Sequence, residues 1–139
     1  MRIFYTDGSC SPNPGPGGWS VIEGDKPVAL GHAKDSTNIR MEGEALIAAM
    51  TLAGGEPVKI NTDSEFWINV FTKWAPSWQA KGWKKKSGPI KNLDLVQKGL
   101  EIYQSSKAEL IWVRAHVGTD GNELADEWAN RARVEKKSL

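Results

Sequence analysis

The apolar residues of this chain change their spacing in a set order, and that order restricts the fold more than any other feature. Short runs rich in β-branched and aromatic residues come first, at 2–6, 19–22 and 28–32. Helical spacing follows at 41–52, 64–71 and 93–103, with strand-like segments at 58–62 and 109–113. Asp120, with Glu123 as a capping-box partner, predicts the start of a last helix.

The connections between these segments predict how the strands pair. The first three strands have tight links, which are typical of an antiparallel meander. The last two strands each follow a helical crossover, so they should run parallel to a neighbour through right-handed connections. We therefore expect an α/β fold with a five-stranded mixed sheet, three antiparallel strands and then two parallel ones, and helices on both faces.

Glycine and proline predict where the elements stop. The first strand should end at Asp7, and the proline- and glycine-rich residues 11–18 predict a stiff turn rather than helix or strand. Pro76 should interrupt the helix that Ser64 caps. Residues 134–139 are basic and should fray.

Length and composition exclude several classes of protein. The 139 residues predict one domain spanning 1–139, and 40% hydrophobic with 25% charged residues excludes extended disorder. No apolar run approaches the roughly 18–20 residues that cross a membrane, and the N-terminus becomes acidic too soon for a signal peptide. Cys10 is the one cysteine, so no internal disulfide can form, which is typical of a reducing compartment. We expect a cytoplasmic monomer without an obligate protein partner or membrane association.

The charge of the chain is uneven, although the net charge is only +1. Residues 66–93 contain no acidic residue and six lysines, which leaves −5 for the rest of the chain (1 minus 6). Trp74, Trp78 and Trp83 lie among these lysines. A solvated helix face explains a lysine run alone. Lysines interleaved with tryptophans favour nucleic-acid binding, because rings pack on sugars and bases while ammonium groups meet phosphates.

Two aspartates are expected at one edge of the sheet. Asp7 should end the first strand and Asp63 follows the fourth, each directly after a threonine. Ligands of such folds lie outside the carboxyl ends of the strands. Either residue alone is better explained as a turn residue or a helix cap. Together, on adjacent parallel strands, they predict two carboxylates side by side.

Two further acids can join this pair from helices. Helical periodicity modestly favours Glu42 over Glu44, and it does not choose between Asp126 and Glu127. Four converging carboxylates would carry about −4, which two divalent cations would compensate. Magnesium prefers hard oxygen ligands, and two such ions roughly 3.5–4 Å apart activate a water and stabilise the leaving oxygen in phosphodiester cleavage.

Six motifs in the chain occur in a characteristic order. They are Tyr5-Thr6-Asp7-Gly8-Ser9, Asn13-Pro14-Gly15-Pro16-Gly17-Gly18, Asn38-Ile39-Arg40-Met41-Glu42, Thr62-Asp63-Ser64, His116-Val117-Gly118 and Gly121-Asn122-Glu123-Leu124-Ala125-Asp126. In this order they resemble type 1 ribonuclease H over nearly the whole chain. The lysine- and tryptophan-containing residues 74–91 resemble the basic protrusion, or handle, of bacterial members.

The resemblance implies endonucleolytic hydrolysis of the RNA strand of an RNA–DNA hybrid, leaving 3′-hydroxyl and 5′-phosphate ends. It implies that the metal ligands are Asp7, Glu42, Asp63 and Asp126, holding two Mg²⁺ ions, with Mn²⁺ as a substitute. It also implies that His116 is the family's mobile histidine, which helps proton transfer or product release. A surface loop histidine is the competing interpretation of His116.

Substrate contacts follow from the resemblance as well. Candidates for contacts to the hybrid are Cys10, Asn13, Thr37 and Asn38, with Trp74 for stacking on a deoxyribose and Lys81, Lys84, Lys85 and Lys86 for phosphates. The RNA strand would be identified by its 2′-hydroxyls in a wide, shallow minor groove. The chain departs from the family at Ile39 and Glu65, where amides are common. Grip on the minor groove should therefore be weaker, and the handle more important.

Four alternatives have different sequence signatures. A transposase, junction resolvase or other nuclease of related fold should lack the turn at 13–18 and the handle. A non-catalytic hybrid-binding module would be favoured by replacement of one of the four acids, and none is replaced. A kinase-like domain would need a free glycine loop, which the prolines exclude. A zinc site from Cys10, His32 and His116 is disfavoured by their wide spacing.

Overall fold

The strand-rich first third of the sequence folds into three long antiparallel strands. In the computed structural model, which describes residues 1–114 and 120–139, they are β1 (Arg2–Cys10), β2 (Gly15–Glu23) and β3 (Lys26–Ser36). β2 pairs with both β1 and β3 in antiparallel register. Gly24 adopts a φ of 68° in the tight turn between β2 and β3, a conformation that glycine takes without steric cost.

Two parallel strands complete the sheet. β4 (Pro57–Thr62) runs parallel to β1, and β5 (Lys107–Trp112) runs parallel to β4. The strand order is β3-β2-β1-β4-β5. The predicted five-stranded mixed sheet, with three antiparallel strands followed by two parallel ones, is confirmed.

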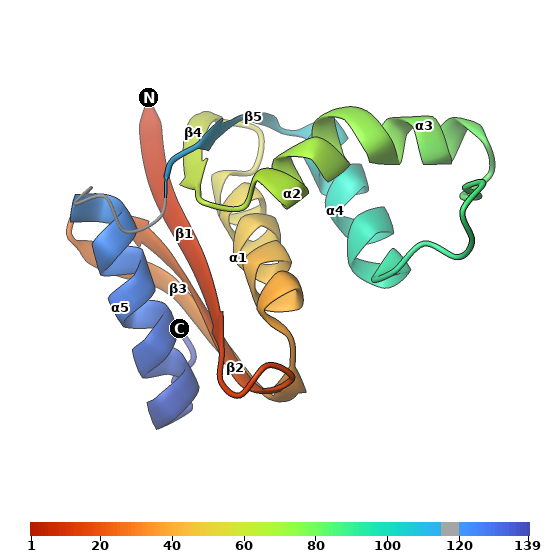
Figure 1. Cartoon of the computed structure of the whole chain (residues 1–139). Helices are drawn as coiled ribbons and strands as arrows, with labels where there is room; N and C mark the ends of the chain where they lie inside the picture. The colour runs from red at the N-terminus through yellow and green to blue at the C-terminus, as the bar shows by residue number, and fades with distance from the viewer. Residues whose placement is uncertain (115–119) are drawn as a thin grey trace.

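Helices cover both faces of the sheet (Figure 1). α1 (Asn38–Ala53) packs on β1 and β2 from one side, and α4 (Leu93–Ser105) packs on α1. α5 (Asp120–Glu135) packs on β1, β2 and β3 from the other side. The core between the sheet and α1 includes Phe4, Leu46 and Trp67, all fully buried.

Two strands are longer than predicted. β1 continues to Cys10 instead of ending at Asp7, because its second half goes on pairing with β2 after its parallel pairing with β4 has ended. β2 begins at Gly15, so the prediction of a turn throughout 11–18 is wrong for its last four residues. A β-carbon on Gly18 would overlap the backbone of α5, so the glycine here permits close approach of a helix rather than a turn.

The helical segment after β4 is continuous through Pro76. It consists of α2 (Glu65–Asn69), a π-helical stretch η1 (Val70–Trp74) and α3 (Ala75–Ala80). Proline lacks an N–H and its ring crowds the preceding turn of an α-helix. The wider π-helical turn before Pro76 takes up this conflict, so the predicted interruption is a change of helix type instead of a break.

The last residue of the chain lies against the edge of the sheet. Leu139 exchanges two backbone hydrogen bonds with Leu30 of β3, with N···O distances of 3.4 and 3.0 Å. The tail at 134–139, which we expected to fray, is therefore held at one point in the structure. No helix among residues 1–114 and 120–139 has the length and apolar character needed to span a membrane.

Candidate active site

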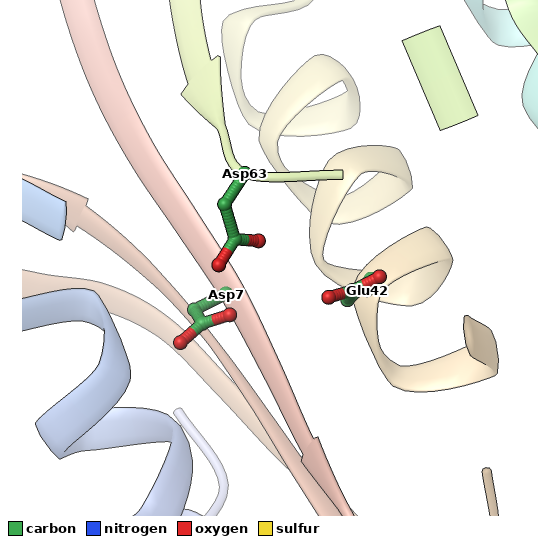
Figure 2. A group of neighbouring side chains, drawn as sticks. All are labelled: Asp7, Glu42 and Asp63. Atoms are coloured by element: carbon green, nitrogen blue, oxygen red, sulfur yellow. The ribbon is translucent and has the colours of Figure 1, made fainter. Parts of the chain in front are cut away.

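Three carboxylates from three elements lie together at one edge of the sheet. Asp7 comes from β1, Glu42 from α1 and Asp63 from the loop after β4, and Figure 2 shows their side chains around one space. One carboxylate oxygen of each lies within 4.8 Å of the other two. In the part of the chain that the structure describes, this is the only such group of three or more His, Cys, Asp or Glu side chains.

The register of the parallel strands explains why the two aspartates meet. The last parallel pair between β1 and β4 joins Tyr5 to Asn61, and Asp7 and Asp63 each lie two residues beyond it. Asp7 is inside β1 and not at its end, as predicted, yet it lies at the carboxyl edge of the parallel ladder. The side-by-side placement predicted from sequence is therefore present.

Glu42 reaches this edge because α1 packs directly on the backbone of β1. A β-carbon on Gly8 would overlap the backbone of Met41 and Glu42, so only glycine permits this approach. The Gly8 N–H also donates a hydrogen bond to Asp7 Oδ1 at 2.9 Å. The sequence analysis assigned no role to Gly8, although its place directly after Asp7 was visible.

Asp63 is positioned by the turn that starts α2. The Ser64 N–H donates to Thr62 Oγ1 at 3.1 Å, and Ser64 Oγ accepts from the Trp67 N–H at 3.3 Å, which confirms Ser64 as the helix cap. Trp112 Nε1 donates to the backbone oxygen of Asp63 at 3.3 Å. Sequence analysis missed Trp112, whose position at the end of the strand beside β4 was the available signal.

The structure separates the acids that helical periodicity left open. Asp126 of α5 is half-buried and shares a side-chain hydrogen bond with Asp7, in which the protonated Asp7 carboxyl donates, whereas Glu127 is exposed. On α1, Glu44 interacts with Arg40 and lies outside the carboxylate group. The structure thus brings Asp126 beside the three carboxylates. His116 lies outside the described residues.

Burial and crowding change the acidity of the carboxylate group. Burial, then the charge of Asp63, then the hydrogen bond with Asp126 raise the pKa of Asp7 to about 9. Burial, followed by the charge of Asp63, raises the pKa of Glu42 to about 7. Without a cation, the group therefore retains protons at neutral pH. A divalent cation would favour the ionised carboxylates and displace these protons.

A second set of predicted residues gathers between the β1–β2 loop and the start of α1. Asn13 Oδ1 accepts a hydrogen bond from the Asn38 N–H at 3.2 Å, and Thr37 Oγ1 caps α1 by accepting from the Arg40 N–H at 3.1 Å. Cys10 is buried, and its thiol contacts backbone oxygens in this loop. The structure thus brings Asn13, Thr37 and Asn38 together and turns the Cys10 side chain inward.

The predicted handle, residues 74–91, carries exposed aromatic and basic side chains. Trp74 is 40% exposed, and its ring lies 5.9 Å from Phe66 and 6.5 Å from Trp78 between centroids. Lys85 Nζ lies 5.7 Å from the Trp78 ring centroid. Lys81, Lys84 and Lys86 are exposed. A cavity of about 640 Å³ opens between the handle, α2 and the start of α1, lined in part by Ile39, Phe66 and Trp74.

Comparisons with known proteins point to one family. The model of the RNase H family matches residues 1–134. Ribonuclease HI of Pseudomonas aeruginosa strain PAO1 is 42% identical over 138 residues, covering 96% of this chain and 93% of that protein. Ribonuclease H of Alcanivorax borkumensis strain SK2 is 44% identical over 140 residues, covering 97% and 93%.

A solved structure extends the similarity to three dimensions. LC9-RNase H1, a type 1 RNase H with the type 2 active-site motif, matches with a TM-score of 0.86 and 29% sequence identity. The match covers 99% of this chain and 74% of that one. The sequence and the fold therefore lead to the same group of enzymes.

Proposed function

The chain belongs to the ribonuclease H family and is a ribonuclease H enzyme, and we propose that it hydrolyses the RNA strand of RNA–DNA hybrids. Cleavage is endonucleolytic and leaves 5′-phosphate and 3′-hydroxyl ends. The group formed by Asp7, Glu42 and Asp63 is the observation that carries this proposal, because its oxygens lie within 4.8 Å of one another at the edge of the sheet.

The donor set of this group fits magnesium. Carboxylate oxygens are the hard ligands that Mg²⁺ prefers, and the raised pKa values of Asp7 and Glu42 reflect negative charge that lacks a cation. We propose that Asp7, Glu42, Asp63 and Asp126 hold two Mg²⁺ ions, which Mn²⁺ can replace. When bound, the pair supplies an activated water and a stabilised leaving oxygen.

The chain's own groups prepare this chemistry. The Gly8 N–H fixes the orientation of Asp7 through its 2.9 Å hydrogen bond, and the Ser64 cap and Trp112 fix the backbone around Asp63. Asp7 and Glu42 must release protons before they act as ligands. The protein thereby holds the site rigid while its charge changes.

Recognition of the hybrid is assigned to the surfaces on either side of α1. Asn13, Thr37 and Asn38 are the groups proposed to meet a phosphate of the DNA strand, with Cys10 shaping the loop beneath them. Trp74 is proposed to stack on a deoxyribose, since its ring is exposed at the edge of the handle cavity. The handle lysines Lys81, Lys84, Lys85 and Lys86 would neutralise phosphates without reading sequence.

His116 is proposed to help proton transfer or product release. General acid–base groups contribute roughly 10²-fold or less in such a supporting role. The His116→Ala variant should therefore retain far more activity than a variant that loses a metal ligand. A loss as large as that for Asp7→Asn would contradict this role.

Substrate selectivity tests the proposed function. A strand-labelled RNA–DNA hybrid, duplex RNA and duplex DNA of the same sequence are incubated with the protein, with Mg²⁺ and with chelator. We expect cleavage of the hybrid RNA strand alone, only with metal, and products whose 5′-phosphate supports enzymatic ligation. Failure of the folded protein to cut the hybrid with either Mg²⁺ or Mn²⁺ would favour a non-catalytic hybrid-binding module. Cleavage of duplex DNA would favour another nuclease of related fold.

A further inference from the structure

A second basic surface lies at the C-terminal end of α5. A cavity of about 460 Å³, here called the α5 cavity, is lined by Pro16, His32, Ala33, Lys34, Arg133 and Lys136. None of these six residues is acidic, and four carry basic side chains. The handle and α5 lie on opposite sides of β1 (Figure 1). The α5 cavity is therefore distinct from the handle.

The cations of the α5 cavity have no carboxylate partner among residues 1–114 and 120–139. Lys34, Arg133 and Lys136 take part in none of the ion pairs there. By contrast, the neighbouring cations Arg131 and Lys137 both pair with Glu135, at 3.2 and 3.3 Å. The charge around the cavity is thus available to an anion, while the charge beside it is compensated.

Arg133 is fixed by neutral groups that lead to the carboxylate group. Its Nε donates to Ser9 Oγ at 3.2 Å, and its Nη2 donates to Asn130 Oδ1 at 3.3 Å. Asp126, Asn130 and Arg133 follow at spacings of four and three residues, so they share one face of α5. Seven helical residues span about 10 Å, which corresponds to about three nucleotides at roughly 3.4 Å of helix axis per phosphate in one strand.

Lys136 occupies a backbone conformation that favours glycine. Its φ is 54°, and the Lys137 N–H donates to the Ala132 oxygen at 3.1 Å, the arrangement of a Schellman motif. A β-carbon is disfavoured in this left-handed conformation, so lysine ends α5 less favourably than glycine would. What lysine adds at this position is a charge at the mouth of the α5 cavity.

We propose that the α5 cavity binds a backbone phosphate of the hybrid, about three nucleotides from the cleaved bond and on the side away from the handle. This inference rests on the proposed function and extends its substrate contacts. Arg133 supplies an oriented fork of donors, and Lys34 and Lys136 supply mobile charges. The hybrid is then held on both sides of the carboxylate group by contacts that carry no sequence information.

Binding of a labelled RNA–DNA hybrid at several salt concentrations tests this site. The test variant is Lys34→Ala/Arg133→Ala/Lys136→Ala, and binding is followed by fluorescence anisotropy in chelator, so that no cleavage occurs. The matched control is Lys26→Ala/Lys59→Ala/Lys107→Ala, which removes the same charge from the other end of the sheet. The slope of log affinity against log salt should fall by about 2–3 in the test variant, at roughly 0.7–0.9 per contact. The control should keep the wild-type slope.

The Lys136→Gly variant separates binding from folding. Because glycine suits the backbone at this position, its melting temperature should equal or exceed that of wild type, while the salt slope falls by about 1. An equal slope in the test and control variants, or a Lys136→Gly variant that binds like wild type, would overturn the proposal. Cleavage of the hybrid by wild type is scored in parallel. If wild type cleaves while the test variant matches the control, only this inference fails, and absence of wild-type cleavage counts against the proposed function itself.

Discussion

At the residue scale, Asp7 and Glu42 couple the stability of the protein to pH. Burial first, then the charge of Asp63, raise the pKa of both carboxyls, to about 9 for Asp7 and about 7 for Glu42. A carboxyl whose pKa is higher in the folded state stabilises the fold fully below its ordinary pKa. That stabilisation is lost as the pH rises through the folded-state pKa.

The metal-free protein should therefore lose stability between pH 6 and about 9. We expect the melting temperature in chelator to fall over this window by on the order of 5 °C, and the Asp7→Asn variant to show a smaller fall. Adding Mg²⁺ should raise the melting temperature of wild type more at pH 8.5 than at pH 6. Identical pH profiles for wild type and Asp7→Asn would contradict the raised pKa of Asp7.

Ile39 and Glu65 give a second prediction at this scale. Ile39 is 43% exposed at the handle cavity and Glu65 is exposed, and neither side chain can donate a hydrogen bond to a base edge at neutral pH. The Ile39→Asn/Glu65→Gln variant should lower KM for the hybrid and leave kcat nearly unchanged, because uniform binding improves. Glu101→Gln, on the exposed face of α4, controls for the lost charge. A KM equal to or above that of wild type would contradict this prediction.

Single residues also mark how far sequence alone could reach. Asp7 and Asp63 were predictable as neighbours because each follows a strand-like segment and a threonine. Gly8 and Trp112 were not, since the need for a missing β-carbon and the Trp112 contact with the Asp63 backbone arise only when α1 and β5 are in place. Asp126 needed the family resemblance, because periodicity alone treated Glu127 as its equal.

At the scale of elements, the contact between β1 and α1 controls the geometry of the site. The Gly8→Ala variant should be destabilised by about 1–3 kcal/mol, as is usual when a methyl group is forced into a packed interface. It should also lose most of its activity, because Glu42 moves away from Asp7 when α1 is displaced. Gly55→Ala is the matched control, since a β-carbon at Gly55 meets no atom within 4 Å. Chemical denaturation and hybrid cleavage measure the two effects, and a Gly8→Ala variant as active as Gly55→Ala would contradict this account.

Element types and strand order followed from the sequence, but several boundaries did not. Glycines at 15–18 are typical of turns, yet three of them lie in β2 because α1 and α5 approach the sheet there. Pro76 is a correct signal of local conflict, but the π-helical turn resolves it without breaking the chain. In both places tertiary packing overrides the local preference of the residue.

At the scale of the whole molecule, separation of charge organises binding. The carboxylate group lies between the basic handle and the α5 cavity. The Lys81→Ala/Lys84→Ala/Lys85→Ala/Lys86→Ala variant should lower the slope of log affinity against log salt by up to about 3 and leave kcat at saturating hybrid almost unchanged. Trp74→Ala should lower both affinity and kcat, with a loss that resists salt. An unchanged slope in the lysine variant would show that these lysines are only a solvated face.

The central claim is that the carboxylate group performs metal-dependent cleavage of the hybrid. Its most direct test is the rate of RNA-strand cleavage across a Mg²⁺ titration for wild type, Asp63→Asn and Glu44→Gln. Asp63→Asn removes a proposed ligand with a minimal change in shape, and Glu44→Gln changes an acid on the same helix as Glu42 but outside the group. We predict that Asp63→Asn remains folded and loses cleavage at every Mg²⁺ concentration, while Glu44→Gln behaves like wild type. If Asp63→Asn retains more than about a tenth of the wild-type rate at saturating Mg²⁺, the assignment of Asp63 as a shared metal ligand is wrong.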